Sequence, residues 1–472
     1  MKNYSFGNFL YELRTRIGLT QYQLGALVGV SDKAVSKWEN GSSMPQSNLL
    51  NRLSEVLGVS VDELLTCKYH SFDKKDEKGV FAMEKQFWEK VFAAMHERFG
   101  NPAPIEVVNR LLSEQAELQG SEMIAYFDFL SLLAEETKKR EEHLLVRGAV
   151  GSSLVSYLLD ITPADPMKPH YECPVCHAFF FDDSARDSWD LPPKTCSCGA
   201  EMKADGHNIP FDVIRHAIHH NAGFSIGVSP EMFDDARGML QDYFEDCTLT
   251  KEDYEPVIVS HFSVSAGGQK RSVMLFRAEM LTLYKALEQA THTRFDEIRI
   301  TPDEMLQAFR ECDTDGITEF KSDFMKNMLC IIAPKTFYEL LQISGFAHGT
   351  HVWTNNGSGL IKQGYSASDI IAFRDDVFDY VQTKMHAHGL PDTGLAFTVM
   401  ENARKGFYEK DGIPADEEAC LRAIGAEEWF MDSIKKVMYL FPKAQGVACV
   451  KTAIALMWYK LYHPQEFYDI IL

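Results

Sequence analysis

Apolar positions in the first 66 residues recur three or four apart and are interrupted by turn residues, a pattern typical of short packed helices. Thr20 and Ser31 are hydroxyl residues suited to cap helix starts, and Gly29 and Gly41 are suited to end them. The pattern predicts five helices, over residues 9–17, 21–28, 32–40, 46–57 and 60–65. Their predicted core consists of Leu10, Leu13, Leu24, Val28, Val30, Val35, Trp38, Leu50, Leu53, Leu57 and Leu64.

Residues 69–85 begin with a charged stretch that lacks spaced apolar positions and is predicted to be a linker. Helical periodicity resumes at Phe87, and residues 123–127 are apolar enough for either a strand or a short buried helix. A Gly-Ser turn at 147–153 then precedes a helix whose buried side would include Leu154 and Leu158. The remaining chain again favours helices, so the predicted fold class is mostly α with an α+β part.

Two motifs in the first bundle carry a resemblance to a known family. L-T-Q-Y-Q-L-G-A-L-V-G-V-S spans 19–31, and W-E-N-G-S-S-M-P spans 38–45. They resemble the helix-turn-helix domain of the lambda-repressor/Cro class, whose second helix lies in the major groove of duplex DNA. The resemblance implies a DNA-binding domain over 1–68. Its expected DNA-binding residues are Gln21 and Asn40 at the phosphates, with Ser31, Lys33, Ala34, Ser36 and Lys37 on the recognition helix.

A second resemblance rests on five ordered motifs between Arg147 and Phe211. They read R-G-A-V-G-S-S (147–153), I-T-P-A-D-P (161–166), P-H-Y-E-C-P-V-C (169–176), D-L-P-P-K-T-C (190–196) and D-G-H-N-I-P-F (205–211). This order is similar to the palm of PolC-type, C-family bacterial replicative DNA polymerases. Residues 334–353 and 441–444 resemble the helical fingers of that family. The resemblance implies a palm over 86–275, with a zinc knuckle at 169–211, and a fingers region over 276–472.

Four cysteines within the palm motifs form two close pairs, Cys173 with Cys176 and Cys196 with Cys198. Two such pairs separated by a loop can present four thiolates to one Zn²⁺, which predicts a structural zinc site. The second pair is only C-x-C, so His177 or His207 could replace Cys196 or Cys198. The other six cysteines are scattered, which favours free thiols in a reducing cytoplasm.

The Gly-Ser turn is open to two interpretations. Arg147, Gly151, Ser152 and Ser153 are a candidate triphosphate cradle, because glycine allows close backbone approach to an anion and the first helical N–H groups would face it. The same small residues also suit a tight structural turn. Lys443 and Arg374 are nucleotide or nucleic-acid contacts by resemblance, and a structural role is favoured for both.

The catalytic carboxylates expected from the resemblance are not found. Alignment on Ser229 places Gly223 and Ser225 where two aspartates belong, and the third carboxylate position falls near Met274. Four acids could substitute, Glu231, Asp234, Asp235 and Glu245, but they are expected on the following helix, where solvated surface carboxylates are the simpler interpretation. Template-directed polymerisation requires carboxylates that hold two Mg²⁺ ions. The interval 246–271 is also too short for the basic segment of the family, and the sequence therefore indicates a pseudo-polymerase.

Charge limits how the chain can bind nucleic acid. Across 472 residues, 68 acidic residues exceed 47 basic ones by 21, whereas residues 1–70 hold seven basic and six acidic residues. An acidic body repels nucleic acid, so DNA contact should be local. No signal peptide or membrane span is expected, and a cytoplasmic, nucleoid-associated protein is predicted.

Three functions fit the sequence. The first is a DNA-binding regulator that would bind tightly to an operator as a homodimer and whose body senses a nucleotide or a replication protein. The second is a mimic that competes for partners of the replicative polymerase, as a mobile-element or defence factor would. The third, an active polymerase, requires that the carboxylates be aligned differently.

Overall fold

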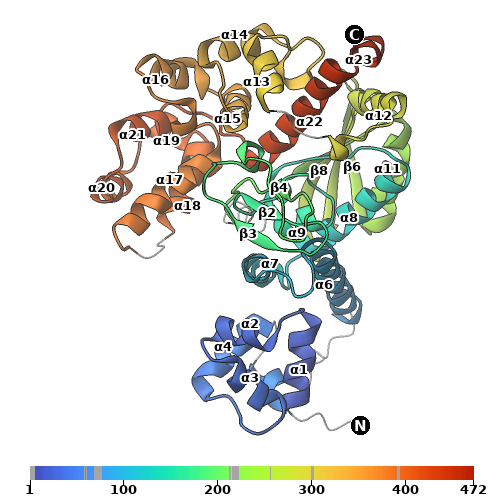
Figure 1. Ribbon diagram of the computed structural model, residues 1–472, viewed down its shortest axis with the longest axis vertical. Coiled ribbons are helices and arrows are strands. Elements are labelled where there is room, and N and C mark those ends of the chain that lie inside the picture. The colour runs from blue at the N-terminus through green and yellow to red at the C-terminus, as the bar shows by residue number, and fades with distance from the viewer. Residues whose placement is uncertain are drawn as a thin grey trace. The chain divides into compact units, whose positions relative to one another are not determined.

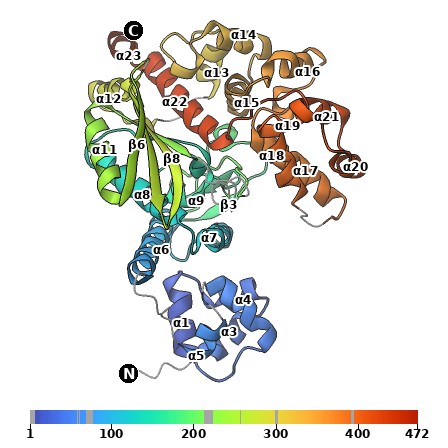
Figure 2. The same cartoon turned by 180° about the vertical axis from the view of Figure 1, so that it is seen from behind.

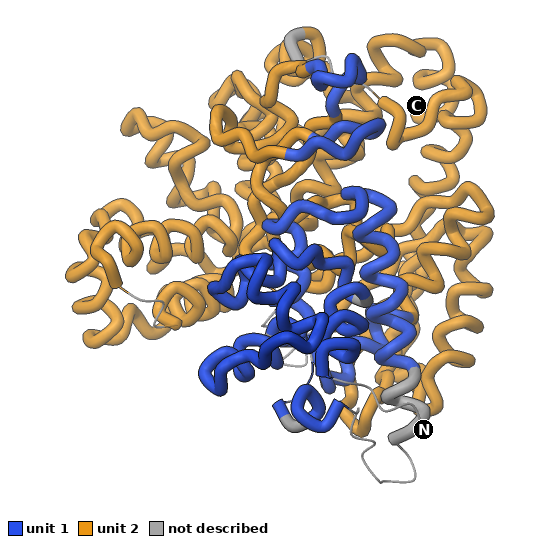
Figure 3. The backbone as a smooth tube through the Cα atoms, turned by 60° about the horizontal axis from the view of Figure 1, so that its bottom comes forward, with its two compact units in different colours: residues 1–128, 172–179, 195–202 blue, residues 129–171, 180–194, 203–472 orange. Residues whose placement is uncertain are grey.

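The structure is a computed structural model of the chain (Figures 1 and 2). It describes residues 6–57, 59, 61–67, 77–211, 214, 223–255, 257–298, 302–390 and 394–472. The chain divides into two compact units (Figure 3). Unit 1 comprises 1–128, 172–179 and 195–202, and unit 2 comprises 129–171, 180–194 and 203–472.

Unit 1 begins with the five helices predicted from the spacing of apolar residues. They are α1 (Phe6–Arg16), α2 (Gln21–Val28), α3 (Asp32–Glu39), α4 (Ser47–Leu57) and α5 (Val61–Thr66). The predicted core is buried except at Val30, which lies in the turn between α2 and α3 and is partly exposed. That turn requires glycine at position 25, because a Cβ there would lie 2.8 Å from the Val30 carbonyl oxygen. The helix-turn-helix prediction is therefore confirmed at the level of fold.

A buried ion pair fixes α3 against α1. Glu39 at the end of α3 accepts hydrogen bonds from the Arg14 guanidinium, whose Nη2 lies 3.0 Å from Glu39 Oε2. The two side chains are only 9% and 6% exposed, so losing either would leave an uncompensated charge in the interior. Removal of one partner from such a pair typically costs about 3–5 kcal/mol.

Unit 1 continues with α6 (Glu77–Phe99), α7 (Ile105–Leu118) and the first residues of α8 (Met123–Lys139). Of the predicted linker 69–85, residues 69–76 lie outside the described part of the chain, and 77–85 already belong to α6. A helix is favoured there because Phe87, Trp88 and Val91 extend its apolar pattern, and all three are buried. The segment 123–127 is the start of α8, so the helical alternative is correct.

Unit 2 contains a five-stranded mixed sheet in the order β1-β5-β8-β7-β6. Its strands are β1 (Leu145–Arg147), β5 (Phe224–Val228), β6 (Asp246–Asp253), β7 (Val259–Ala266) and β8 (Gln269–Arg277). Strands β5 and β8 are parallel, and the other pairs are antiparallel. The interval expected to be too short for the family's basic segment is occupied by β6 and β7.

The strands alternate between a buried and a more open face. On β8, Val273 and Leu275 are buried, while Ser272, Met274 and Phe276 on the other face are exposed or partly exposed. Helix α11 (Phe233–Tyr243) packs against the sheet, with Ala236 and Leu240 buried. A smaller sheet in the order β3-β2-β4 is built from β2 (His170–Glu172), β3 (Phe179–Phe181) and β4 (Lys203–Asp205).

The rest of unit 2 is helical and includes the long helix α22 (Figure 1). One continuous apolar core joins the helices after residue 278, and it includes Phe337, Leu341, Val447 and Leu456. The helices are α9 (Leu154–Leu158), α12 (Glu279–Thr291), α13 (Pro302–Arg310), α14 (Asp323–Ile332), α15 (Phe337–His348), α16 (Ser358–Lys362), α17 (Arg374–Ala387), α18 (Leu395–Arg404), α19 (Phe407–Asp411), α20 (Ala415–Ala423), α21 (Glu428–Ile434), α22 (Lys443–Tyr462) and α23 (Pro464–Ile471). Within the described ranges, no helix is long and apolar enough to cross a membrane.

Candidate nucleic-acid and metal-binding sites

Helix α3 presents the predicted recognition residues at its surface. Lys33 and Lys37 are exposed one turn apart, and Ala34 and Ser36 are partly exposed beside them. The opposite side of α3 is buried through Val35 and Trp38. The exposed side of α3 therefore carries two cationic side chains, while its other side is fixed in the domain core. A recognition helix in the major groove of DNA has this arrangement.

The flanking predicted residues have contacts within the domain. Ser31 caps α3, since its Oγ accepts a hydrogen bond from the Ala34 N–H at 3.3 Å. Gln21 Nε2 donates to Glu39 Oε2 at 2.8 Å, and Asn40 Oδ1 accepts from the Ser42 N–H at 3.0 Å. Each of these side chains stabilises an end of α2 or α3. Their contacts with DNA stay predictions.

All four cysteines of the palm motifs come together in unit 1. Their Sγ atoms lie within 4.8 Å of one another, with Cys173 to Cys198 and Cys176 to Cys196 both at 3.5 Å. Four bonds of about 2.3 Å from a tetrahedral zinc ion would separate the sulfurs by about 3.8 Å. The sulfurs of Cys196 and Cys198 lie within 4.8 Å of each other and of the other two, so both can reach a shared ion. No histidine needs to replace Cys196 or Cys198.

The environment of the thiols lowers the pKa of Cys173 and Cys196 and raises the pKa of Cys176 and Cys198. The backbone N–H of Cys176 lowers the pKa of Cys173 to about 6. The backbone N–H of Ala178 lowers the pKa of Cys176, but its contacts with the thiols of Cys196 and Cys173 outweigh this effect and raise it to about 12. A divalent cation would lower the pKa of all four thiols, so that all four sulfurs could ionise together.

The two proposed histidine ligands lie in other environments. His177 is half-exposed, and its Nδ1 lies 3.9 Å from Glu172 Oε1. His207 is buried, with Nδ1 2.9 Å from Asp187 Oδ2 and its ring against Trp189. His207 therefore belongs to a polar network of unit 2.

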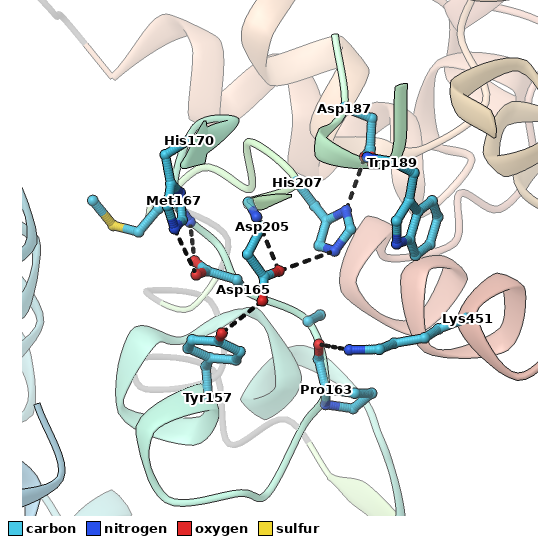
Figure 4. A network of polar contacts seen from close by, with 12 residues as sticks. Tyr157, Pro163, Asp165, Met167, His170, Asp187, Trp189, Asp205, His207 and Lys451 are labelled. Carbon is cyan, nitrogen blue, oxygen red and sulfur yellow. Dashed lines mark hydrogen bonds and ion pairs between the residues drawn. The ribbon is translucent and has the colours of Figure 1, made fainter. Parts of the chain in front are cut away.

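The polar network around His207 anchors residues 161–166, which precede the predicted zinc knuckle (Figure 4). Tyr157 Oη donates to Asp205 Oδ2 at 2.8 Å, and Lys451 Nζ donates to the Pro163 carbonyl at 3.3 Å. Burial alone would raise the pKa of Asp205, but the charges of Lys203 and Lys451 hold it well below the usual range. Burial raises the pKa of Asp165, which accepts a hydrogen bond from the Met167 N–H. The motif residues at 161–166 and 205–207 thus have a structural role.

The positions aligned with catalytic carboxylates lie side by side on the open face of the large sheet. Ser225 on β5 is the register partner of Met274 on β8 and of Arg147 on β1. Met274 in turn faces His261 on β7. Residues opposite one another in register project to the same face, so this row of Arg147, Ser225, Met274 and His261 contains no carboxylate. We call it the central row.

Gly223 precedes this row and has no space for a side chain. A Cβ at this position would lie 2.7 Å from the backbone oxygen of Ser272. An aspartate there would require the β8 backbone to move. The same face carries Asp253 on β6, but Lys251 and His261 already bind its carboxylate, at 2.6 and 3.0 Å.

Of the other candidate acids, Glu231 lies in the 3-10 turn before α11 and Glu245 follows that helix, and both are exposed. Asp234 and Asp235 are exposed in the first turn of α11, and Asp235 forms an ion pair with Arg140. Within the described ranges, two groups of side chains are close enough to share one metal ion: the four cysteines, and Glu319 with His348 and Cys449. Neither group is a set of carboxylates.

The Gly-Ser turn is compact in this structure. Gly148 has a φ of 116°, and a Cβ there would approach Phe224 at 3.3 Å, so this glycine is required by the backbone. A Cβ at Gly151 would have ordinary contacts of 3.7 Å to Thr162, so packing does not require this second glycine. Ser152 and Ser153 are fully buried, and α9 has only five residues.

The cationic residues near the turn differ in exposure. Arg147 is exposed, and its guanidinium lies 4.8 Å from the centre of the Phe276 ring. Lys443 is buried, with Nζ donating to the Asn208 carbonyl at 3.3 Å, and its backbone N–H donates to Asp375. Arg374 is also buried, and burial lowers its pKa. Arg147 is therefore the cation of this group that a dissolved anion can reach.

Comparison with protein families finds matches in three parts of the chain. Residues 10–64 match the helix-turn-helix family model. Residues 85–217 match the NTPase domain of the bacterial DNA polymerase III alpha subunit, and 278–428 match its finger domain. The chain therefore joins a helix-turn-helix DNA-binding domain to a module homologous to the polymerase III alpha subunit.

The similar curated proteins are DNA polymerases III of the PolC type. That of Streptococcus thermophilus is 28% identical over 82% of this chain and 32% of its own length. Those of Caldanaerobacter subterraneus and Thermotoga petrophila are 29% and 28% identical over 79% of this chain and 33% of their own length. The chain thus spans about a third of the relatives it matches.

Proposed function

We propose that this protein is a sequence-specific DNA-binding regulator whose PolC-like module does not polymerise DNA. The observation that carries the proposal is the central row, where Ser225 and Met274 face one another without a carboxylate. Two-metal catalysis needs negatively charged oxygen ligands that bridge the ions, and neither a hydroxyl nor a thioether can supply that charge.

The DNA contact is assigned to α3. Lys33 and Lys37 are exposed on this helix, while the body of the protein carries all of the excess negative charge. A single helix reads only a few base pairs, so tight operator binding would require a dimer on two half-sites. Transcription control at such an operator is the simplest role for this domain.

The knuckle is proposed to hold one structural Zn²⁺. Four cysteine ligands would leave no open position for water, so the ion would stabilise the fold and take no part in chemistry. The spacing of 3.5 Å between sulfurs supports the assignment.

The PolC-like module is proposed to act as a sensor. Arg147 is exposed at the Gly-Ser turn, and Gly151 is a glycine that packing does not require. Both features suit an anionic ligand such as a nucleoside triphosphate. The buried hydroxyls of Ser152 and Ser153 would have to become accessible when it binds.

A second candidate function is a mimic that competes for protein partners of the replicative polymerase. It is favoured by similarity that extends over both the NTPase and finger regions. Such a protein would retain binding surfaces without needing the catalytic residues.

Two assays on the purified full-length chain test these functions. Primer extension with Mg²⁺ or Mn²⁺ and all four nucleotides should yield no product. Selection from random duplexes at physiological salt should enrich one sequence, and Lys37→Ala should weaken binding to it. Extension that is lost in Asp234→Ala or Asp235→Ala would overturn the proposal, because it would place the catalytic carboxylates on α11. Affinity purification from the source cell would separate the regulator from the mimic.

A further inference from the structure

Three potential metal ligands from distant parts of the sequence converge in unit 2. Glu319 lies in a short 3-10 turn (Thr318–Phe320), His348 is the last residue of α15, and Cys449 lies in the second turn of α22. One carboxylate oxygen, one imidazole nitrogen and the thiol sulfur all lie within 4.8 Å of one another. His348 Nε2 is 2.9 Å from Glu319 Oε2.

The packing around His348 holds its ring in one orientation. The imidazole stacks on Phe441, with ring centres 4.7 Å apart and planes inclined by 22°. Nε2 is buried and, despite its short distance to Glu319, lacks the alignment of a hydrogen bond. The side chains of Glu319 and His348 are 23% and 30% exposed, so solvent and ions can reach the cluster.

Charge around the cluster is mixed. Burial alone would raise the pKa of Glu319, but His348 and Arg147 outweigh it and lower the value. Burial raises the pKa of Cys449, and the nearby Glu319 adds to this effect while Arg147 opposes it. Binding of a divalent cation would release the thiol proton of Cys449, because the thiolate is the ligand.

We propose that Glu319, His348 and Cys449 bind one divalent transition-metal ion of the zinc class, independently of the four-cysteine knuckle. One oxygen, one nitrogen and one sulfur donor are a ligand set that suits Zn²⁺ and Co²⁺ and does not suit Mg²⁺ or Ca²⁺. Three protein ligands leave a fourth position open, so this site differs in kind from the closed knuckle. The proposal does not depend on the proposed regulatory function.

Metal content of the full-length chain tests it. Protein purified without chelator and dialysed against metal-depleted buffer should contain two zinc ions per chain by elemental mass spectrometry. Cys449→Ala, His348→Ala and Glu319→Gln should each lower this to one. Cys420→Ala and His386→Ala, which replace exposed residues of the same types on α20 and α17, should leave it at two.

Cobalt provides a second readout. Wild-type protein loaded with Co²⁺ should show visible absorption from both sites, and its difference from Cys449→Ala should be the spectrum of a site with one thiolate. Glu319→Gln keeps the side-chain size and serves if Cys449→Ala does not fold. A wild-type content of one zinc that is lost in Cys173→Ser and kept in Cys449→Ala would overturn the second site and leave the knuckle intact. Two zinc ions in all three ligand variants would also overturn it.

Discussion

Aspartates introduced at Ser225 and Met274 would test whether these positions share one face, as the proposed loss of catalysis requires. The two residues are register partners on neighbouring parallel strands. Strands lie about 4.8 Å apart, so the new carboxylates would lie about 5 Å apart on the open face. With an effective dielectric constant of about 20, two like charges at that distance repel by about 3 kcal/mol.

Chemical denaturation at pH 8 should measure this repulsion in a double-mutant cycle. The free energy of unfolding of Ser225→Asp/Met274→Asp should fall by about 3 kcal/mol more than the sum of the two single changes. Each single variant should be less affected, because Arg147 and His261 flank the two positions in the central row. The asparagine pair, which has nearly the same shape and no charge, is the matched control and should show no such coupling.

Metal ions should reverse the effect without creating a polymerase. Mn²⁺ at 100 times its dissociation constant should return about 2.7 kcal/mol to the double aspartate variant and nothing to the asparagine variant. Primer extension should still be absent, because Gly223 cannot accept a side chain. A coupling energy below about 0.5 kcal/mol, together with no response to Mn²⁺, would refute the shared face and with it the main support for a pseudo-polymerase.

Three further changes test other parts of the structure. Lys37→Ala should reduce the slope of log affinity against log salt by about 0.9 on the selected duplex, whereas Lys410→Ala should not change it. Cys173→Ser should remove one zinc ion per chain and lower thermal stability, as elemental analysis and calorimetry would show. Asp379 lies on α17, where burial raises its pKa from 3.8 to about 7. Between these two values the folded chain holds a proton that the unfolded chain releases. The free energy of unfolding should therefore fall as the pH rises from about 4 to 7. Asp379→Asn should remove up to about 4 kcal/mol of this dependence in denaturation curves, and an unchanged pH profile would contradict the assignment.

The helices of the first bundle could be predicted because their signals are local. Thr20 caps α2 through a capping box and Gly29 ends it in the left-handed conformation, so the predicted and observed bounds coincide. The fingers were recognised through resemblance, and the four cysteines through their spacing. In each case neighbouring residues in the sequence carried the information.

The central row and the second metal cluster could not be predicted in this way. The sheet register that pairs Ser225 with Met274 depends on strands almost 50 residues apart, and alignment of sequence motifs contains no information on that register. Glu319, His348 and Cys449 are separated by 29 and 101 residues, and no local spacing marks them as one site. Only the packing of α15 and α22 brings them together.

The distribution of charge connects the two halves of the proposed function. Residues 1–70 hold seven basic and six acidic residues, so the remaining chain holds 40 basic and 62 acidic ones. A polymerase must hold the phosphates of its template, whereas this body repels a nucleic acid at long range. The basic residues that the resemblance assigns to nucleotide contact, Lys443 and Arg374, are buried in the protein interior. On the proposed function, α3 alone therefore attaches the protein to DNA, and the PolC-like body is left to bind a small anion, a metal ion or another protein.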